Sequence, residues 1–185
     1  MAEEFFRFAR AAQHVRDLED ALAASCTAMG FQYFALTHHV DFGNSPDSAV
    51  RMHNYPSSWV SYFDENGLGQ SDPIHRASHV TSVGFAWSAV PQMIRMTRAD
   101  RDILARAGRI GIADGFTVPG HVPGEVNGSC SFAVAPGCHL PGDHLNVAQL
   151  IGAFAFEGAR RLTGLRRIDT SGKPILTDRQ RDFVL

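Results

Sequence analysis

The stretch NYPSSWVSYFDENGLGQSDPIHRASHVTSVGFAW, residues 54–87, is the most informative part of this 185-residue chain. It holds both tryptophans and two of the three tyrosines. The proline after Tyr55 is expected to open a short helix, and Trp59 and Phe63 follow Tyr55 at four-residue steps, so the rings form one stripe. Such a stripe is most often core, and an aspartate before a proline, such as Asp72, is most often a helix N-cap. Spacing alone therefore favours structural roles.

The chain before this stretch predicts a helix followed by a β-hairpin. Apolar residues recur at three- and four-residue intervals from Phe5 to Met29, which predicts one amphipathic helix with Gly30 as its C-cap. The aromatic, β-rich run FQYFALTHHV, residues 31–40, predicts a buried strand. After a turn cluster, AVRMHNY, residues 49–55, predicts a second strand that pairs with the first.

The chain after the stretch predicts a helix, two strands and a last helix. Residues 98–108 form a clear helical pattern with Thr97 as the N-cap. The runs DGFTVPGHV, residues 114–122, and GSCSFAVA, residues 128–135, predict two strands joined by a Pro/Gly turn. A long helix is expected over residues 143–165.

The order of these elements is α-β-β-α-α-α-β-β-α, with a helix opening at Pro73 and residues 81–90 expected to be irregular. Antiparallel hairpins separated by helices predict the α+β class. We expect an α-β-α sandwich, in which a small antiparallel sheet of about five strands is flanked by helices on both faces.

Composition fits a single globular domain. The chain is 44% hydrophobic and 19% charged, with a formal net charge of −2, which excludes a disordered chain and argues against a phosphate-binding basic surface. Cys26, Cys130 and Cys138 show no CxxC spacing, so neither disulfides nor a zinc ribbon is expected. The N-terminus does not resemble a secretory signal, and residues 145–162 are too polar to span a bilayer. A cytoplasmic location is expected.

Motifs typical of enzymes and metal sites are missing from the sequence. It contains no GxGxxG, P-loop, GxSxG or HExxH motif. His75 and His79 are four residues apart, but no third ligand lies at a telling spacing, and His38 and His39 should point to opposite faces of a strand. We therefore expect no catalytic residues, no metal and no cofactor.

The aromatic stretch also carries a family resemblance. Its pattern is Y-P-x-x-W, an aromatic residue four positions on, D-P thirteen after the tryptophan, and a second tryptophan fifteen after the aspartate; the matching residues are Tyr55, Pro56, Trp59, Phe63, Asp72, Pro73 and Trp87. This pattern resembles the autoinducer-binding domain of LuxR-type quorum-sensing regulators.

The resemblance extends over essentially the entire chain. GFQYFAL, residues 30–36, is similar to the first strand of that family, and GIADGFTVPGH, residues 111–121, to its G-x-x-x-G-x-T-x-P-x-H segment. GSCSFAV, residues 128–134, places Ser131 at the polar position of a G-x-x-S strand. PILTDRQRDFVL, residues 174–185, resembles the opening of a LuxR-type helix-turn-helix domain.

The resemblance implies a cytoplasmic receptor that encloses an N-acyl-homoserine lactone, without a cofactor, a metal or a membrane. It divides the chain into a sensor domain at 1–168, a linker at 169–175 and the start of a truncated helix-turn-helix domain at 176–185. A homodimer is expected, with DNA binding only through the missing C-terminal domain.

The resemblance also implies roles at the lactone head group. The Trp59 indole N–H donates to the lactone carbonyl, and the Asp72 carboxylate accepts from the amide N–H. The Tyr55 hydroxyl donates to the amide carbonyl, with Ser131 as a second donor. Because an indole only donates and a carboxylate only accepts, the two ends of the head group are not interchangeable. One Asp72 oxygen can cap a helix while the other meets the ligand.

Apolar contacts complete the implied site. Trp87 and Phe63 would pack around the lactone ring and the start of the acyl chain. Two residues depart from the family pattern. The family often has tyrosine at the position of Phe63, and it commonly has leucine at the position of Gly120. Residues implied more weakly at the acyl tail are Ala35, Thr37, Ile112 and Thr117.

Three other functions stay open from the sequence. The same fold could sense another small molecule, such as an aryl-acylated lactone or a host-derived compound. A lactone or amide hydrolase could use Ser131 or Cys130. An interaction domain could carry the aromatic residues as an ordinary core.

Overall fold

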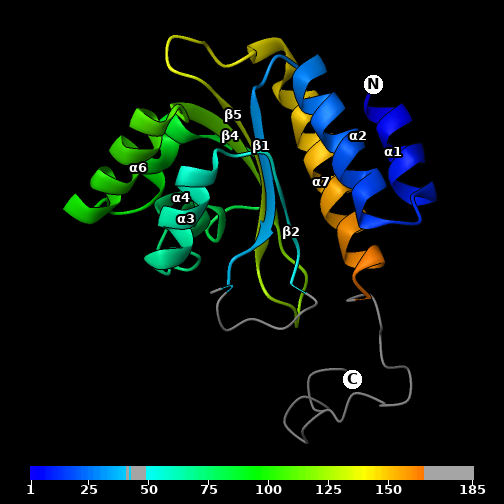
Figure 1. Cartoon of the computed structure of the whole chain (residues 1–185), viewed down its shortest axis with the longest axis horizontal. Coiled ribbons are helices and arrows are strands. Elements are labelled where there is room, and N and C mark those ends of the chain that lie inside the picture. The colour runs from blue at the N-terminus through cyan, green and yellow to red at the C-terminus, as the bar shows by residue number, and fades with distance from the viewer. Residues whose placement is uncertain (41, 43–48, 165–185) are drawn as a thin grey trace, which may run out of the picture.

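A computed structural model describes residues 1–40, 42 and 49–164 of the chain. A five-stranded antiparallel sheet in the order β2-β1-β5-β4-β3 lies between two helical layers (Figure 1). The strands are β1 (Tyr33–His38), β2 (Arg51–His53), β3 (Phe85–Ala86), β4 (Asp114–Gly120) and β5 (Gly128–Val134). The predicted α+β sandwich with helices on both faces is confirmed.

The two helical layers differ in size. The layer that carries both ends of the described chain contains α1 (Ala2–Ala11), α2 (Val15–Ala28) and α7 (Leu145–Leu162) (Figure 1). The opposite layer contains α3 (Ser57–Glu65), α4 (Pro73–Ser78), α5 (Val90–Met93) and α6 (Arg98–Ile110). Short 3₁₀ turns at Trp87–Ala89 and Gly142–His144 precede α5 and α7.

The first strand faces both layers by simple alternation. Phe34 and Leu36 are buried against the α7 layer, whereas Ala35 and Thr37 point to the other face and stay partly exposed. In the register of the sheet, Ala35 pairs with Ser131 on β5. The face opposite α7 therefore carries small and polar side chains at its centre, where it can line a cavity.

The main core lies between the sheet and the layer of α1, α2 and α7. Its largest fully buried side chains include Phe31, Phe132, Leu18 and Ile151. Burial of each such side chain contributes about 1.5–3 kcal/mol to folding. A smaller cluster around Trp59 occupies the opposite face of the sheet. The main core and the cluster around Trp59 thus lie on opposite faces of the sheet.

The single helix predicted from Phe5 to Met29 is wrong. The chain forms α1 and α2, because Ala12 adopts an extended conformation with φ −53° and ψ 133°. The backbone N–H of His14 then donates to Asp17 Oδ2 at 3.2 Å, which begins the second helix. The reversal lets both helices pack against α7.

Two further details differ from the sequence prediction. Residues 81–90, expected to be irregular, contain the short edge strand β3 and the 3₁₀ turn that begins at Trp87. The last helix starts at Leu145 and ends at Leu162, inside the predicted bounds of 143–165. The predicted linker and helix-turn-helix segment, 169–185, lie outside the described residues. Within residues 1–40, 42 and 49–164, no helix is long and apolar enough to cross a bilayer.

Candidate ligand-binding site

A groove lies between the sheet and the layer of α3, α4 and α6, and it has two adjoining lobes. Residues that line both lobes are Ala35, Thr37, Tyr55, Trp59, Phe63 and His75. The lobe that we name the tryptophan lobe adds Asp72, Ile74, Trp87, Leu104, Ala107, Ile112 and Ser131. The lobe that we name the arginine lobe adds Phe42, Arg51, His53 and Val60.

Both lobes are narrow. Each has a cavity volume of about 50 Å³, far below the roughly 300–1,000 Å³ of typical small-molecule pockets. Their walls, however, combine aromatic rings with a few polar side chains, which is the usual lining of such pockets. A ligand of drug-like size must therefore widen the groove as it binds.

Helix α3 places Trp59 at the centre of the groove. Pro56 precedes the helix, and its carbonyl accepts from the Trp59 backbone N–H at 2.9 Å. The Trp59 side chain is 6% exposed, with the Phe63 ring at 6.0 Å between centroids. Within the described residues no hydrogen-bond acceptor is assigned to the Trp59 indole N–H. The Trp59 indole N–H is therefore available to donate a hydrogen bond to a ligand in the tryptophan lobe.

The Tyr55 ring lies beside Trp59, on the segment that enters α3. It makes an edge contact with Tyr33, with 6.1 Å between ring centroids. Burial, and then the negative charge of Asp72, raise the pKa of the Tyr55 hydroxyl. The phenol therefore stays protonated at physiological pH and can donate a hydrogen bond into the groove.

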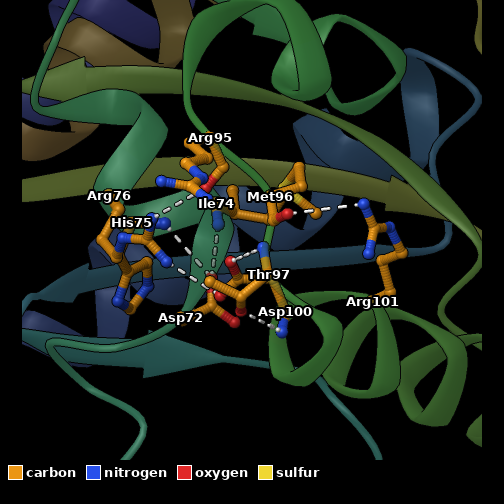
Figure 2. A network of polar contacts seen from close by, with 9 residues as sticks. All are labelled: Asp72, Ile74, His75, Arg76, Arg95, Met96, Thr97, Asp100 and Arg101. Carbon is orange, nitrogen blue, oxygen red and sulfur yellow. Dashed lines mark hydrogen bonds and ion pairs between the residues drawn. The ribbon is translucent and has the colours of Figure 1, made fainter.

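Asp72 is the N-cap of α4, and its two carboxylate oxygens have different roles. Oδ1 accepts from the backbone N–H groups of Ile74 at 2.8 Å and His75 at 3.1 Å (Figure 2). Asp72 is 5% exposed, and no partner is assigned to Oδ2 among the described residues. The capping prediction is confirmed, and the second oxygen is left for another donor at the tryptophan lobe.

A chain of three side chains crosses the strands behind the groove. The Trp87 indole N–H donates to Thr117 Oγ1 at 2.9 Å, and Thr117 Oγ1 lies 2.8 Å from Ser131 Oγ. Thr117 is fully buried, and Ser131 Oγ is its remaining partner in the described part of the chain. If Thr117 gives its proton to Ser131, the Ser131 hydroxyl proton is directed to a further acceptor at the groove.

The Trp87 ring packs directly against the backbone of Gly115 on β4. A Cβ on Gly115 would lie 2.6 Å from Trp87 Cε2 and 2.7 Å from the Phe132 carbonyl oxygen. These distances are shorter than any normal carbon contact, so β4 can approach the indole ring only without a side chain at this position. The wall formed by Trp87 depends on this close approach.

An ion pair supports α4 from outside the groove. Arg76 Nη1 donates to Asp100 Oδ1 at 2.8 Å, and Thr97 and Asp100 form a capping box that begins α6 (Figure 2). Burial by itself would raise the pKa of Asp100, but hydrogen bonds from Thr97 and Arg76 more than offset it and lower this pKa. The charged pair therefore ties the helix that bears Asp72 to α6.

A cluster of imidazoles adjoins the groove at His75, whose ring stacks on that of His39. His39 Nδ1 lies 2.7 Å from His79 Nε2, and His39 Nε2 lies 2.9 Å from Ser129 Oγ. Burial, then the neighbouring imidazoles, hold the pKa of His39 well below its ordinary value. In the part of the chain that the structure describes, no three His, Cys, Asp or Glu side chains are arranged to hold a metal ion.

Most of the residues singled out from the sequence meet at this groove. Those that line it are Ala35, Thr37, Tyr55, Trp59, Phe63, Asp72, Trp87, Ile112 and Ser131. Thr117 instead lies behind the wall, bonded to Trp87 and Ser131. Ile112 lines the tryptophan lobe, with Leu104 and Ala107, and not the arginine lobe.

Several lining residues were missed by the sequence prediction. His75 lies one turn along α4 from Asp72, a spacing that the predicted helix at Pro73 already implied. Arg51 and His53 lie on β2, and no sequence motif marks them. Arg76, the support of α4, was missed because its partner Asp100 is distant in sequence.

Comparison with known proteins decides the family. A family model of the autoinducer-binding domain matches residues 14–162. The chain belongs to this family, the ligand-sensing domain of LuxR-type regulators. It is 24% identical to the transcriptional activator BjaR1 of Bradyrhizobium diazoefficiens over 155 residues, which cover 80% of this chain and 61% of BjaR1. It is 26% identical to the transcriptional activator VanR of Vibrio anguillarum over 167 residues, which cover 89% of this chain and 68% of VanR.

Solved structures of the same fold agree with this assignment. Escherichia coli SdiA superposes with a TM-score of 0.69 at 17% identity, covering 98% of this chain and 74% of SdiA. CepR2 of Burkholderia cenocepacia, an N-acylhomoserine lactone dependent LuxR-family transcription factor, gives 0.64 at 18% identity, covering 89% of this chain and 94% of CepR2. At these identities the likeness establishes the fold of the autoinducer-binding domain.

The relatives are transcriptional activators, and the family is a ligand-binding domain and not an enzyme. Cys130 agrees, because it lies in the main core on the sheet face opposite Ser131, and burial raises its pKa well above the ordinary value. Ser131 hydrogen-bonds Thr117, and no histidine is bonded to it within the described residues. The groove therefore offers binding groups without an activated nucleophile.

Proposed function

We propose that this autoinducer-binding domain binds an N-acyl-homoserine lactone in the groove, with the head group in the tryptophan lobe. The observation that carries the proposal is the convergence of a buried donor at Trp59 with a buried acceptor at Asp72 Oδ2, both without assigned partners in the described part of the chain. Neither atom is among the unpartnered side-chain atoms that are sealed from water in the described residues, so each is accessible to a ligand in the groove. A hydrogen bond to a charged group such as the Asp72 carboxylate contributes about 1.5–3 kcal/mol.

The head group of an acyl-homoserine lactone matches these groups in kind and in order. Its lactone carbonyl accepts from the Trp59 indole, and its amide N–H donates to Asp72 Oδ2. Its amide carbonyl accepts from the Tyr55 hydroxyl, and from Ser131 when Thr117 donates to Ser131. An inverted head group would set its carbonyl against the Asp72 carboxylate, so a single orientation is favoured.

The rings and the second lobe account for the rest of the ligand. Trp87 and Phe63 cover the lactone ring, and Phe63 offers an apolar face where relatives with a tyrosine would offer a hydroxyl. The acyl chain passes Ala35 and Thr37, which line both lobes, toward the arginine lobe. We propose Ile112 as a contact of the ring end, while Thr117 acts through Trp87 and Ser131.

Ligand binding of this kind stabilises the folded domain by mass action. In a longer protein that continues past residue 185, this domain would control dimerisation and DNA binding through a C-terminal domain. The likeness to transcriptional activators, of which this chain spans 61% and 68% of the length, supports that role.

A second ligand class is favoured by one comparison. SdiA in complex with octanoyl-rac-glycerol has the same fold, with a TM-score of 0.68 at 18% identity over 98% of this chain and 72% of that one. An acylglycerol lacks the amide N–H but presents hydroxyl groups, which could donate to Asp72 Oδ2. The two classes differ in what they require of Asp72, because in Asp72→Asn the NH2 group that replaces Oδ2 can donate to a hydroxyl but not to an amide N–H.

A thermal-shift titration tests the proposal. At a lactone concentration of about 100 Kd, the unmodified protein should gain about 2.7 kcal/mol, or roughly 5–10 °C in Tm. Asp72→Asn should still cap α4, since asparagine is a good N-cap, but should lose most of the shift. Asp20→Asn, an exposed change on α2, is the matched control. The proposal is contradicted if Asp72→Asn shows the same lactone-induced Tm shift as the unmodified protein. It is also contradicted if octanoylglycerol raises the Tm of the unmodified protein and none of the lactones does.

A further inference from the structure

His75 occupies a position between the two lobes of the groove and lines both of them. Its ring stacks on that of His39, with centroids 3.8 Å apart and planes at 13°. Phe63 meets it edge-on at 5.7 Å. The imidazole is therefore held between two rings, with its orientation fixed at the junction of the lobes.

A hydrogen bond to the backbone sets the tautomer of His75. His75 Nδ1 lies 2.8 Å from the Gly69 carbonyl oxygen. A carbonyl oxygen only accepts, so Nδ1 carries the proton. In the neutral ring Nε2 then holds a lone pair and is an acceptor. The contact with Gly69 thus makes Nε2 of His75 a hydrogen-bond acceptor.

The acceptor nitrogen of His75 is open to the groove. Among the described residues no partner is assigned to Nε2. It also differs from His38 Nε2 and His53 Nδ1, which are the unpartnered side-chain atoms sealed from water in the described part of the chain. His75 is half-buried and faces both lobes, so a bound molecule can reach this lone pair.

The distance along α4 places this acceptor relative to the proposed head group. Asp72 and His75 are three residues apart, which corresponds to about 4.5 Å along a helix axis. With the ligand amide N–H at Asp72 and the acyl chain running along α4 toward the arginine lobe, we expect carbon 3, two bonds beyond the amide carbonyl carbon, to face His75.

We propose that His75 is a specificity-determining residue that selects acyl-homoserine lactones with a hydroxyl group on carbon 3. This inference rests on the proposed function. A 3-hydroxyl donates to the Nε2 lone pair, whereas a 3-oxo group would set its own lone pairs against it. An unsubstituted chain leaves Nε2 without a partner. The expected order of affinity is 3-hydroxy, then unsubstituted, then 3-oxo.

Three synthetic lactones of equal chain length, with 3-hydroxy, 3-oxo and unsubstituted acyl groups, test the selection by calorimetry at about pH 8, where an ordinary imidazole is neutral. The unmodified protein should bind the 3-hydroxy form about tenfold more tightly than the 3-oxo form. His75→Phe retains a planar ring for the stack and should bring this ratio close to one. His139→Phe, at an exposed position after β5, should leave it unchanged.

A measurement without any substitution complements the variant. In ¹⁵N NMR of the imidazole groups, His75 Nε2 should give the signal of an unprotonated nitrogen and shift when the 3-hydroxy lactone binds. A protonated Nε2, or a 3-oxo affinity equal to or above the 3-hydroxy affinity, overturns the role of His75. If all three lactones bind with equal affinity, only this inference fails. If none binds, the proposed function fails as well.

Discussion

Arg76 and Asp100 form a 2.8 Å ion pair that joins two helices on one side of the groove. Asp100 is 3% exposed and also caps α6, so one carboxylate fixes the start of α6 and the side of α4. Arg76 is four residues beyond Asp72 on the same short segment. The position of the proposed ligand acceptor thus depends on a pair that does not line the groove.

Loss of this pair should weaken ligand binding without removing a ligand contact. Arg76→Ala leaves Asp100 buried and without its arginine, which we expect to cost about 2 kcal/mol of stability, less than for a fully buried pair because Arg76 is partly exposed. Lactone affinity should fall several-fold, measured by calorimetry. Arg101→Ala is the control, since Arg101 is exposed and, among the described residues, donates only to the Met96 carbonyl at 3.4 Å. Equal effects of the two substitutions would contradict this role.

Gly115→Ala should disrupt the wall formed by Trp87. The new Cβ would clash with the indole ring and with the Phe132 carbonyl, which we expect to destabilise the domain by about 1–3 kcal/mol. Tryptophan fluorescence should change and the lactone-induced Tm shift should shrink. Gly108→Ala in α6 has open space around its Cβ and should instead stabilise by about 0.5–1 kcal/mol. If Gly115→Ala binds lactone as tightly as the unmodified protein, the position of Trp87 does not depend on its close contact with Gly115.

Thr117→Val tests the hydroxyl behind the wall. Valine has nearly the same shape, but it leaves the Trp87 indole N–H unpaired and removes the partner of Ser131 Oγ. We expect a stability loss of about 1–3 kcal/mol by urea unfolding, with a weaker affinity for lactone. Thr27→Val removes an exposed hydroxyl on α2 that, in the described part of the chain, bonds only to the Ala23 carbonyl of its own helix, and it should change neither quantity. An unaltered affinity in Thr117→Val would remove Thr117 from the ligand argument.

The imidazole cluster should make stability depend on pH. The folded pKa of His39 lies well below the ordinary value of 6.5, so the unfolded chain binds a proton more readily between these two values. The contribution of neutral His39 is therefore fully present above pH 6.5 and is lost as the pH falls toward the folded pKa. Burial also lowers the pKa of His38, His53 and His79, which adds to the same trend.

Urea unfolding at about pH 8 and pH 5.5 measures this dependence. The domain should be less stable at the lower pH, and His39→Gln should reduce the difference, since glutamine does not titrate. His14→Gln, at an exposed position before α2, should retain the full difference. Identical pH profiles for His39→Gln and the unmodified domain would contradict the assignment.

Local signals in the sequence predicted much of the fold. The capping pattern from Thr97 to Asp100 marked the start of α6, and the aromatic, β-rich run at residues 31–40 marked β1. The break between α1 and α2 was missed because apolar spacing continues across residues 12–14. The edge strand β3 was missed because two residues carry little local signal, and it pairs with Phe116 and Thr117, which are remote in sequence.

The sequence also predicted part of the candidate site, namely the residues that a motif marks. Motif spacing brought out Trp59, Asp72 and Trp87, which the fold places on one groove. It did not single out His75, because no motif marks that residue, although the helix expected from Pro73 places it one turn from Asp72. Thr117 was expected at the acyl tail because the family resemblance implied it by position, and its hydrogen bonds to Trp87 and Ser131 could not be read from the sequence.

The capped carboxylate of Asp72 has an entropic consequence for recognition. Its Oδ1 is held by two backbone N–H groups, so the side chain already occupies one rotamer. Ordering a mobile side chain on association costs about 0.5–1.5 kcal/mol. A ligand that meets Oδ2, as proposed here, avoids that loss, because the side chain is already ordered before the ligand arrives.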